Sequence, residues 1–345
     1  MSEMCVSALQ CLFYPFERGV WALPEERVAF LNAQVCPGLD ILRGRDVFLQ
    51  QFFYPYVEQL KVSGYDVASE FPCFGTAYDV VFIALPKSLD EARYMVSCAL
   101  QCLKDGGLVV AAAANDAGGG RIEKMFAHFG LGDVLCESKY KSKVCCARKE
   151  CVNAEEVERA LVLGSLQEVV ATSFYARPGV YGWNKIDKGS QKLVQHLPDD
   201  LCGAGADFGC GYGYLSAHVL QNYDIERMTC LDADFRALEA CEKNLSGFDS
   251  VQQKYLWRDL THVQKDLSGQ FDFIVMNPPF HEGKNTDLSI GKAFILSAAD
   301  ALKKGGRLYM VANRQLAYED VLHSGFSKVD KLFEGEGFKV FCAVK

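Results

Sequence analysis

The chain contains two copies of one pattern, and this repetition constrains its fold more than any other feature. Three segments of the first half match three of the second half in the same order: residues 79–86 match 272–279, 103–107 match 302–306, and 143–147 match 339–343. The offsets agree to within six residues, so chance is a poor explanation. A length of 345 residues also suits two domains. We therefore predict two homologous domains in tandem.

Each copy has the rhythm of an α/β fold. In the second copy a short apolar run at 273–276 is long enough for a buried strand. Apolar residues then recur at helical spacing over 289–303. Gly305 and Gly306 are expected to end this helix and to turn the chain into a strand at 308–312. The first copy has the same elements, with its helix over 89–103. This alternation predicts mostly parallel sheets covered on both faces.

The copies differ where a ligand site is expected. Only the second copy has the glycine-rich segment at 207–213. We therefore expect a first domain over residues 1–150 that keeps the scaffold and has no cofactor site. A connecting segment over 151–171, with a helix at Glu155–Glu168, leads to a second, catalytic domain over 172–345. The predicted fold class is α/β, with two tandem Rossmann-like domains of which the N-terminal one is degenerate.

Composition excludes several other classes of protein. The longest apolar runs fall short of the ~18 residues that span a bilayer, and Glu3 stands where a secretory signal would carry positive charge. The fifteen cysteines include no Cys-x-x-Cys pair, which argues against a zinc site. A net charge of −8 argues against bulk wrapping by nucleic acid but allows a local basic surface. We expect a cytoplasmic monomer with reduced thiols, no metal and no membrane contact.

The segment Asp207-Phe-Gly209-Cys210-Gly211-Tyr-Gly213 precedes a helix-like stretch and is our candidate cofactor segment. Glycines allow a ligand to approach the backbone closely. The spacing is not the Gly-x-Gly-x-x-Gly of dinucleotide sites, and no Gly-Lys-Ser/Thr follows. Asp207 would repel a pyrophosphate, but it suits the cationic aminoacyl end of S-adenosylmethionine. The alternative is a tight turn without a ligand, and Cys210 is interpreted there as a small space-filling residue.

Two further carboxylates are candidates for contacts to a nucleoside. Asp232 ends the apolar run at 228–231, and at a strand end it can accept bonds from both ribose hydroxyls. Asp234 is its rival, although we expect it to cap the following helix. Asp259 could receive the adenine amino group, unless it is an exposed loop residue.

The sequence Asn277-Pro278-Pro279-Phe280 directly follows a predicted buried strand, at the sheet edge where open α/β sheets bind ligands. The two prolines hold the chain extended. The Asn277 side-chain oxygen and the Pro278 carbonyl can then accept both hydrogens of one planar NH2 group. Phe280 offers a face on which a base can stack. A rigid corner without chemistry is the alternative.

This arrangement suits an amine that is a poor nucleophile. The exocyclic amine of a purine delocalises its lone pair into the ring. Two fixed acceptors, aimed where positive charge develops on nitrogen, favour the transition state over the ground state. Positioning the amine in line with a sulfonium methyl contributes further. The segment therefore indicates methyl transfer by direct in-line displacement.

The second half resembles the class I S-adenosylmethionine-dependent methyltransferases, and in detail the chain resembles the bacterial guanine-N2 methyltransferases of small-subunit ribosomal RNA. The segments that carry the resemblance are Arg177–Val180, Asp187–Ser190, Asp207–Gly213, Asn277–Gly283, Val311–Asn313 and Phe338–Val340. The likeness covers nearly the whole chain, because the family also has a degenerate N-terminal copy with a Leu-Pro-Lys like residues 85–87. Residues before about Asp79 match poorly, and Tyr181 stands where the family usually has phenylalanine.

The resemblance implies cofactor contacts at Asp207, Gly209, Gly211 and Asp232, with the target amine at Asn277–Phe280. Asn277 is also a candidate cofactor contact, as are Cys210, Gly213 and Asp259. It implies ribosomal RNA or the small ribosomal subunit as partner, and a base that leaves its stack to react. Further candidate RNA contacts flank the site: Phe280, His281, Lys284, Lys185 and Lys188. The basic run of Lys139, Lys141, Lys143, Arg148 and Lys149 is either a solvated strand face or a surface for RNA phosphates.

Other functions remain open at this level. The same chemistry could act on a guanine of large-subunit ribosomal RNA, since a sister family shares the tandem design. Asn-Pro-Pro followed by an aromatic residue also serves glutamine side chains and DNA adenine, for which tyrosine is more usual than Phe280. A non-enzymatic RNA-binding assembly factor is a rival of another class, although the intact glycines and Asn277 argue against it. A nicotinamide oxidoreductase is a distant third.

Overall fold

The computed structural model describes residues 3–23, 27–279 and 288–345. It divides into two compact units, each of which is described by itself. Unit 1 comprises Met1–Ser165 and Arg177–Gly179, and unit 2 comprises Leu166–Ala176 and Val180–Lys345.

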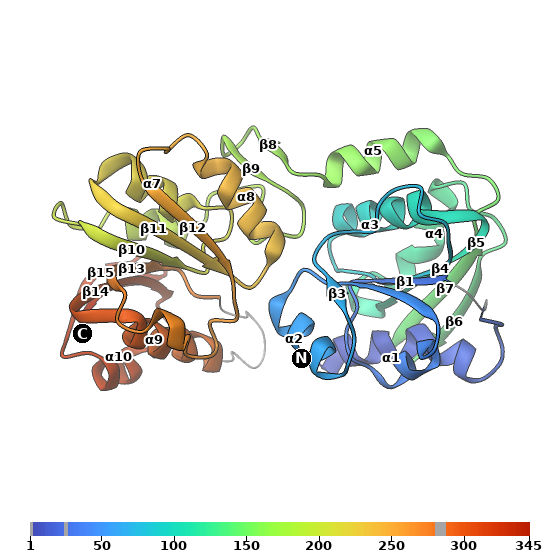
Figure 1. Cartoon of the computed structure of the whole chain (residues 1–345), viewed down its shortest axis with the longest axis horizontal. Helices are drawn as coiled ribbons and strands as arrows, with labels where there is room; N and C mark the ends of the chain where they lie inside the picture. The colour runs from blue at the N-terminus through green and yellow to red at the C-terminus, as the bar shows by residue number, and fades with distance from the viewer. Residues whose placement is uncertain (1–2, 24–26, 280–287) are drawn as a thin grey trace. The chain divides into compact units, whose positions relative to one another are not determined.

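Unit 1 is built on one seven-stranded sheet with the strand order β3-β2-β1-β4-β5-β7-β6. Only β7 and β6 break the parallel arrangement: β7 runs antiparallel to β5, and β6 antiparallel to β7. Its elements, in chain order, are α1 (Glu3–Glu17), β1 (Arg27–Leu31), the 3-10 helix η1 (Pro37–Leu42), β2 (Asp46–Gln50), α2 (Tyr54–Val62), β3 (Val67–Ala68), β4 (Tyr78–Ala84), α3 (Leu89–Cys102), β5 (Leu103–Ala114), η2 (Asn115–Ala117), η3 (Gly119–Arg121), α4 (Ile122–His128), β6 (Leu135–Lys139), β7 (Ser142–Arg148) and α5 (Ala154–Gly164) (Figure 1).

Unit 2 has the same architecture, with the strand order β12-β11-β10-β13-β14-β16-β15. A small separate sheet pairs β8 with β9. The elements, in chain order, are β8 (Gln167–Val169), β9 (Phe174–Ala176), α6 (Lys188–Val194), β10 (Gly203–Phe208), α7 (Tyr214–Asn222), β11 (Ile225–Asp232), α8 (Phe235–Leu245), β12 (Gln252–Trp257), η4 (Lys265–Leu267), β13 (Phe271–Met276), α9 (Ser289–Ala301), β14 (Leu302–Asn313), α10 (Glu319–Gly325), β15 (Lys328–Gly335) and β16 (Phe338–Val344).

The matching strand orders confirm the duplication that the sequence predicts. The segments that match in sequence occupy the same places in the two sheets, as β4 and β13, β5 and β14, and β7 and β16. Each sheet is parallel except for its last hairpin. The predicted α/β class with mostly parallel sheets is therefore confirmed.

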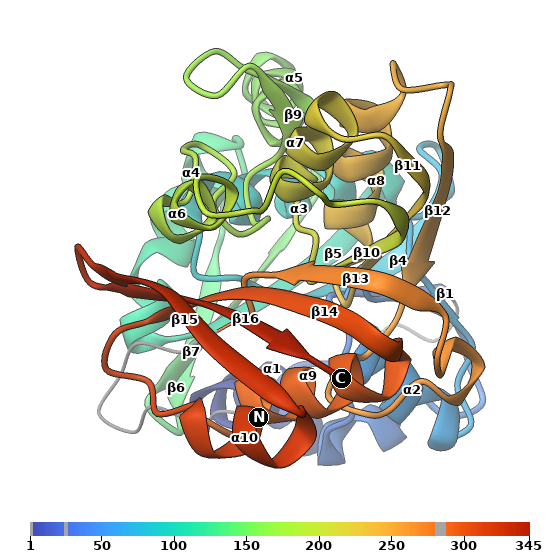
Figure 2. The ribbon, with the colours of Figure 1, turned by 90° about the vertical axis from the view of Figure 1, so that its left-hand side faces the viewer.

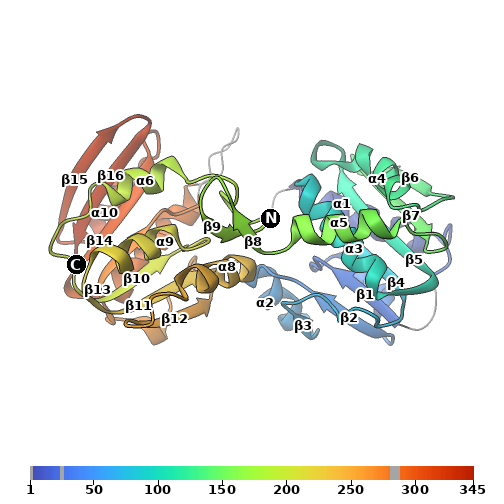
Figure 3. The same cartoon turned by 90° about the horizontal axis from the view of Figure 1, so that it is seen from above.

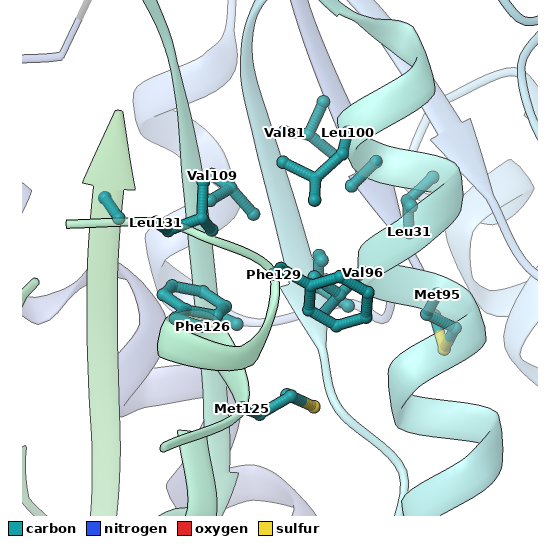
Figure 4. Packing of buried hydrophobic residues seen from close by; sticks show 14 of the residues in the cluster. Leu31, Val81, Met95, Val96, Leu100, Val109, Met125, Phe126, Phe129 and Leu131 are labelled. Atoms are coloured by element: carbon teal, nitrogen blue, oxygen red, sulfur yellow. The ribbon is translucent and has the colours of Figure 1, made fainter. Parts of the chain in front are cut away.

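Both sheets are covered on both faces. In unit 1, side chains that alternate along the strands pack into two separate cores, one under α3, α4 and α5 and the other under α1. Figure 4 shows the first core, in which Val96 and Leu100 of α3 and Phe126 of α4 meet Val81 and Val109 of the sheet. In unit 2, α9 and α10 cover one face, while α6, α7 and α8 cover the other (Figure 2). Burial on two faces explains why the central strands are continuous apolar runs.

The structure corrects three details of the sequence analysis. The helix expected over Glu155–Glu168 is α5, which begins at Ala154 and ends at Gly164 because the next residues enter the β8–β9 sheet. It packs against α3 within unit 1, as Figure 3 shows. Strand β14 already begins at Leu302, which pairs with Phe271, so Gly305 bends the strand at a φ of 79° instead of ending the helix.

The third correction concerns the thiols. Cys136 and Cys145 form a disulfide across β6 and β7, where the register places the two residues directly opposite each other. The odd number of cysteines and the lack of a spacing framework predict reduced, mostly buried thiols. Strand register brings this pair together, and register leaves no spacing signal in the sequence. In the described part of the chain, no helix is long and apolar enough to cross a membrane.

Candidate active site

The sequence-predicted residues of unit 2 meet at the carboxyl edge of its sheet. Phe208 at the end of β10 pairs with Leu231 of β11 and with Met276 of β13. The residues that follow these three are Gly209, Asp232 and Asn277, so they leave neighbouring strands at the same level. Since adjacent strands lie ~4.8 Å apart, this edge presents a glycine loop, a carboxylate and an amide within roughly 10 Å.

The glycine loop adopts a backbone that its sequence requires. Gly209, Gly211 and Gly213 have φ values of 76°, 55° and 90°, in the left-handed region that other residues rarely adopt. A side chain at Gly213 would lie 2.8 Å from Cys241 Sγ in α8, so this glycine allows close helix packing. A side chain at Gly211 would meet nothing within 4 Å. The loop is therefore tightly packed below and open at Gly211.

Asp232 closes the loop from the neighbouring strand. Its Oδ2 accepts the backbone N–H of Gly211 at 2.8 Å, and its Oδ1 accepts that of Asp234 at 2.8 Å. Burial raises the pKa of Asp232 to about 6, with a contribution from the nearby charge of Asp234. Asp234 itself caps α8 through the backbone N–H of Arg236 and pairs with its guanidinium. The expectation that Asp234 is a helix cap is thus confirmed.

Asp207 lies at the end of β10 and is completely buried. Ser216 of α7 donates its hydroxyl to Asp207 Oδ2 at 2.6 Å. Asp207 Oδ1 is buried and has no hydrogen-bond partner among the described residues. Burial raises the pKa of this carboxyl group well above its usual value, and the bond from Ser216 only partly offsets that effect. Such a group has an unmet capacity to accept a hydrogen bond.

Cys210 directs its side chain into the core below the loop. It packs there with Cys230 and Cys241, and burial raises the pKa of its thiol. Because a thiolate is the reactive form, this environment suits the space-filling interpretation.

The Asn277 side chain is held in one orientation by a second loop. Its Nδ2 donates to Asp187 Oδ2 at 2.8 Å and to Ser190 Oγ at 2.9 Å. Asp187 is also the N-cap of α6 and accepts the Ser190 N–H with the same Oδ2 at 2.9 Å. The hydroxyl of Tyr181 donates to Asp187 Oδ1 at 3.2 Å. With both amide hydrogens bound, the Asn277 carbonyl oxygen is the end of the group that faces away from Asp187.

The remaining predicted residues fall into three groups. Pro278 is buried and Pro279 is exposed. Asp259 already bonds within its own loop, to Thr261 through Oδ1 and to His262 through Oδ2. Two of the predicted RNA contacts are exposed: Lys185 lies on the loop before α6, and Lys188 is the first residue of α6. The others, Phe280, His281 and Lys284, lie outside the described residues.

The equivalent edge of unit 1 is filled by amide side chains. Leu31 of β1 pairs with Gln50 and with Ile83, so Asn32, Gln51 and Ala84 take the places of Gly209, Asp232 and Asn277. The Gln51 amide donates to Asn32 Oδ1 and to the Ala33 carbonyl, and the Asn32 amide donates to the Ala84 carbonyl. Gln51 is only 1% exposed. Two neutral amides that bond to each other thus stand where unit 2 has Gly209 and Asp232.

Three positioning residues were missed by the sequence reasoning. Asp187 and Ser190 stand in a motif shared with the family, but no local pattern says that their side chains hold Asn277, which is 90 residues away from Asp187. Asn244 of α8 donates to the carbonyls of Tyr175 and Tyr212 and so ties the glycine loop to β9. A single asparagine within a helix gives no sequence signal for such a tie.

The hydrogen-bond acceptors and the open space of the candidate site fit S-adenosylmethionine. Asp207 offers a buried acceptor that has no partner in the described part of the chain, Asp232 offers a carboxylate beside the loop, and Gly211 leaves open space. Carboxylates suit an ammonium group and ribose hydroxyls, whereas they would repel the pyrophosphate of a nicotinamide dinucleotide. Among the residues that the structure describes, no cluster of three or more His, Cys, Asp or Glu could hold a metal ion.

Comparison with known proteins shows what the whole chain is similar to. A family model described as methyltransferase small domain matches residues 171–342. A curated ribosomal RNA small subunit methyltransferase C of Shewanella loihica is 30% identical over 270 residues, which cover 76% of this chain and 76% of that relative. Its namesake in Psychromonas ingrahamii is 29% identical over 271 residues, which cover 78% of this chain and 76% of the relative.

A solved structure resembles the chain over nearly its whole length. The structure is the T. thermophilus 16S rRNA N2 G1207 methyltransferase (RsmC) in complex with AdoMet and guanosine. The two proteins are 26% identical with a TM-score of 0.81, and the match covers 97% of this chain and 91% of the other. Both the tandem Rossmann-like fold and the resemblance seen in the sequence are confirmed. The chain belongs to the ribosomal RNA small subunit methyltransferase C family.

Proposed function

We propose that this enzyme, an S-adenosylmethionine-dependent RNA methyltransferase, methylates the exocyclic N2 amine of a guanine in small-subunit ribosomal RNA by direct in-line displacement. The observation that carries the proposal is the Asn277 amide, which Asp187 and Ser190 hold with its carbonyl oxygen turned away from them. The T. thermophilus relative, which acts on N2 of a 16S rRNA guanine and was solved with AdoMet and guanosine, supports the choice of substrate. A ribosomal RNA substrate implies a cytoplasmic enzyme, and we expect it to be a monomer.

In this proposal, the carboxyl edge of unit 2 binds the cofactor. Asp207 Oδ1 accepts from the aminoacyl ammonium, Asp232 accepts from the ribose hydroxyls, and the loop at Gly209–Gly213 provides close backbone contact. Asp259 keeps its proposed contact to the adenine amino group. When bound, the cofactor supplies an electrophilic methyl group on a sulfonium centre. Asp207 Oδ1 has no hydrogen-bond partner among the described residues, and Asp232 lies beside the loop, so a cationic, hydroxyl-rich ligand would satisfy both.

The chain's own contribution to catalysis is to position and polarise the amine. Asn277 Oδ1 and the Pro278 carbonyl accept the two N–H bonds of the guanine NH2, and Phe280 stacks on the base. The hydrogen bonds from the amine to these two oxygens become stronger as positive charge develops on nitrogen, so they stabilise the transition state more than the ground state. A general base is not needed, because the product ammonium is acidic enough to lose its proton to water. Lys185, Lys188, His281 and Lys284 are proposed to contact the RNA.

Asp187 is proposed as the positioning residue for Asn277. Three substitutions separate this role from its role as the N-cap of α6. Asp187→Ser keeps a helix cap, but its shorter side chain cannot reach the Asn277 amide. We expect kcat to fall about 10- to 100-fold, because the Asn277 amide can then turn its own NH2 toward the substrate amine. Both groups are hydrogen-bond donors, so no hydrogen bond forms between them in that orientation. Asp187→Asn keeps an acceptor at the position of Oδ2, so we expect it to retain most of the wild-type kcat. Steady-state methylation assays measure both.

Asp187→Ala controls for the cap, since it removes both the cap and the hydrogen bond to Asn277. Its melting temperature should fall below that of Asp187→Ser, by an amount that corresponds to about 1 kcal/mol of stability, while the two kcat values should agree. If Asp187→Ser instead turned over like the wild type, Asp187 would serve only the helix.

The proposed substrate is tested by labelled methyl incorporation into RNA from separated ribosomal subunits. We expect label in small-subunit RNA, recovered as N2-methylguanosine after digestion to nucleosides. Label confined to large-subunit RNA would favour the sister activity. S-adenosylmethionine binding without transfer to any RNA would favour an assembly factor instead.

A further inference from the structure

The turn between β6 and β7 in unit 1 has an unusual sequence for its backbone. Tyr140 and Lys141 form a two-residue hairpin turn with φ values of 53° at both positions. Such turns strongly favour Asn-Gly or Asp-Gly, because both residues must adopt positive φ. The equivalent turn of unit 2, between β15 and β16, uses Glu336 and Gly337. Unit 1 therefore places an aromatic and a basic side chain where backbone preference argues against both.

These two side chains belong to an exposed aromatic and basic cluster. Tyr140 is 45% exposed, and its ring meets the ring of Tyr14 from α1 edge to face, at 5.9 Å between centroids. The Lys139 ammonium lies 5.7 Å from the centroids of both rings. Arg18 of α1 donates to the Tyr14 hydroxyl at 3.3 Å. The tip cluster is defined as Tyr14, Arg18, Lys139, Tyr140 and Lys141.

The charges of the tip cluster are available to a ligand. Arg18, Lys139 and Lys141 are all exposed, and no described carboxylate forms a salt bridge with any of them. Lys143, on the same strand pair, is by contrast paired with Glu123. A chain with a net charge of −8 thus concentrates three unpaired cations beside two tyrosine rings.

We propose that the tip cluster binds an unpaired stretch of the RNA substrate, an inference that rests on the proposed function. A base stacks on the exposed Tyr140 ring, while Lys141 and Arg18 contact neighbouring phosphates. Aromatic rings interleaved with cations are the recurring means of binding single-stranded nucleic acid, because every base has a face that can stack. A double-stranded partner would leave the rings unused, since its bases are already stacked. In this proposal Tyr140 and Lys141 occupy the turn because they bind RNA, although a different turn sequence would be more stable.

The sharpest test is the double substitution Tyr140→Asn/Lys141→Gly, which installs the turn sequence that the backbone prefers. We expect its melting temperature to equal or exceed that of the wild type. Its dissociation constant for a fluorescein-labelled, unstructured oligoribonucleotide, measured by fluorescence anisotropy, should rise about 10- to 100-fold. The slope of log affinity against log salt should also decrease, by about 0.7 for each phosphate that the variant no longer neutralises. A better-folded protein that binds RNA less well cannot be explained by damage to the fold.

Two further variants complete the design. Lys124 is exposed on α4, which covers the sheet face opposite to α1, so Lys124→Ala removes a charge from the same unit without touching the cluster. Its affinity should stay within about twofold of the wild type. Tyr140→Phe/Lys141→Arg keeps the ring and the charge and should bind RNA like the wild type. The proposal is overturned if Lys124→Ala loses as much RNA affinity as Tyr140→Asn/Lys141→Gly, or if Tyr140→Asn/Lys141→Gly binds RNA with unchanged affinity.

This result is separable from the proposed function. The anisotropy measurement needs no S-adenosylmethionine and no methyl transfer. In the methylation assay, Tyr140→Asn/Lys141→Gly should raise KM for RNA and leave kcat unchanged, with unchanged calorimetric affinity for S-adenosylmethionine. If the wild type methylates no ribosomal RNA, the proposed function fails even where the tip cluster binds the oligoribonucleotide. If methylation proceeds and KM does not move, the tip cluster does not bind the RNA.

Discussion

Asn277→Ala should reduce kcat for RNA methylation about 100- to 1,000-fold, the range observed when one fixed polar group that stabilises a transition state is removed. The substitution deletes the oxygen that is proposed to accept an amine N–H. The corner itself should persist, because Pro278 and Pro279 fix its backbone and Pro278 is buried. Single-turnover assays with saturating RNA measure the chemical step most directly.

The control for this variant is its affinity for the cofactor. We expect calorimetric titration with S-adenosylmethionine to give a dissociation constant within a few-fold of the wild type, since the main proposed cofactor contacts, Asp207, Asp232 and the Gly209–Gly213 loop, lie on β10, β11 and the loop after β10. A combined loss of turnover and cofactor binding would show that Asn277 belongs to the cofactor pocket and not to the amine site.

Asp232→Ala should weaken S-adenosylmethionine binding about 10- to 100-fold. The alanine removes the proposed acceptor for the ribose hydroxyls, and hydrogen bonds to charged groups contribute roughly 1.5–3 kcal/mol. It also releases the Gly211 N–H that Asp232 holds at 2.8 Å, while the bonds from the Gly209 and Cys210 N–H groups to the Leu231 carbonyl remain. Unchanged affinity would transfer the ribose role to Asp234, although that residue already pairs with Arg236.

The same carboxylate should give cofactor binding a pH dependence. Burial raises the pKa of Asp232 to about 6, so the free enzyme takes up a proton there as the pH falls through that value. Affinity for S-adenosylmethionine should therefore decrease below about pH 6, and Asp232→Ala should lack this step. The effect on folding has the opposite sign. Because the folded state holds this proton more tightly than the unfolded state, the contribution of Asp232 to stability rises as the pH falls from 7 toward 4. A flat calorimetric profile would contradict the assignment.

Much of the fold could be predicted because the same sequence pattern occurs in both halves of the chain. The apolar runs of β4 and β13 each pass through a sheet covered on both faces, so their continuous hydrophobicity signals a buried parallel strand. Helix ends were less predictable. The helix α5 ends at Gly164 because the following residues pair in the β8–β9 sheet, and tertiary pairing of this kind leaves no local signal.

The backbone geometry of the candidate site could be predicted from the sequence. Three glycines in the left-handed region and two adjacent prolines are visible in any sequence. The side chains that orient Asn277 were not, because Asp187 approaches it only through tertiary structure. The absence of the glycine-rich segment from the first copy was visible in the sequence, but the hydrogen bonds of the Gln51 amide at the equivalent edge of unit 1 were not.

The most direct test of the account is a crystal structure with S-adenosylhomocysteine and guanosine. We expect the cofactor over the Gly209–Gly213 loop, its ribose at Asp232, and the guanine N2 within hydrogen-bonding distance of Asn277 Oδ1, on the side from which the sulfur would deliver its methyl group. A cofactor bound in unit 1, or a guanine amine remote from Asn277, would contradict the account.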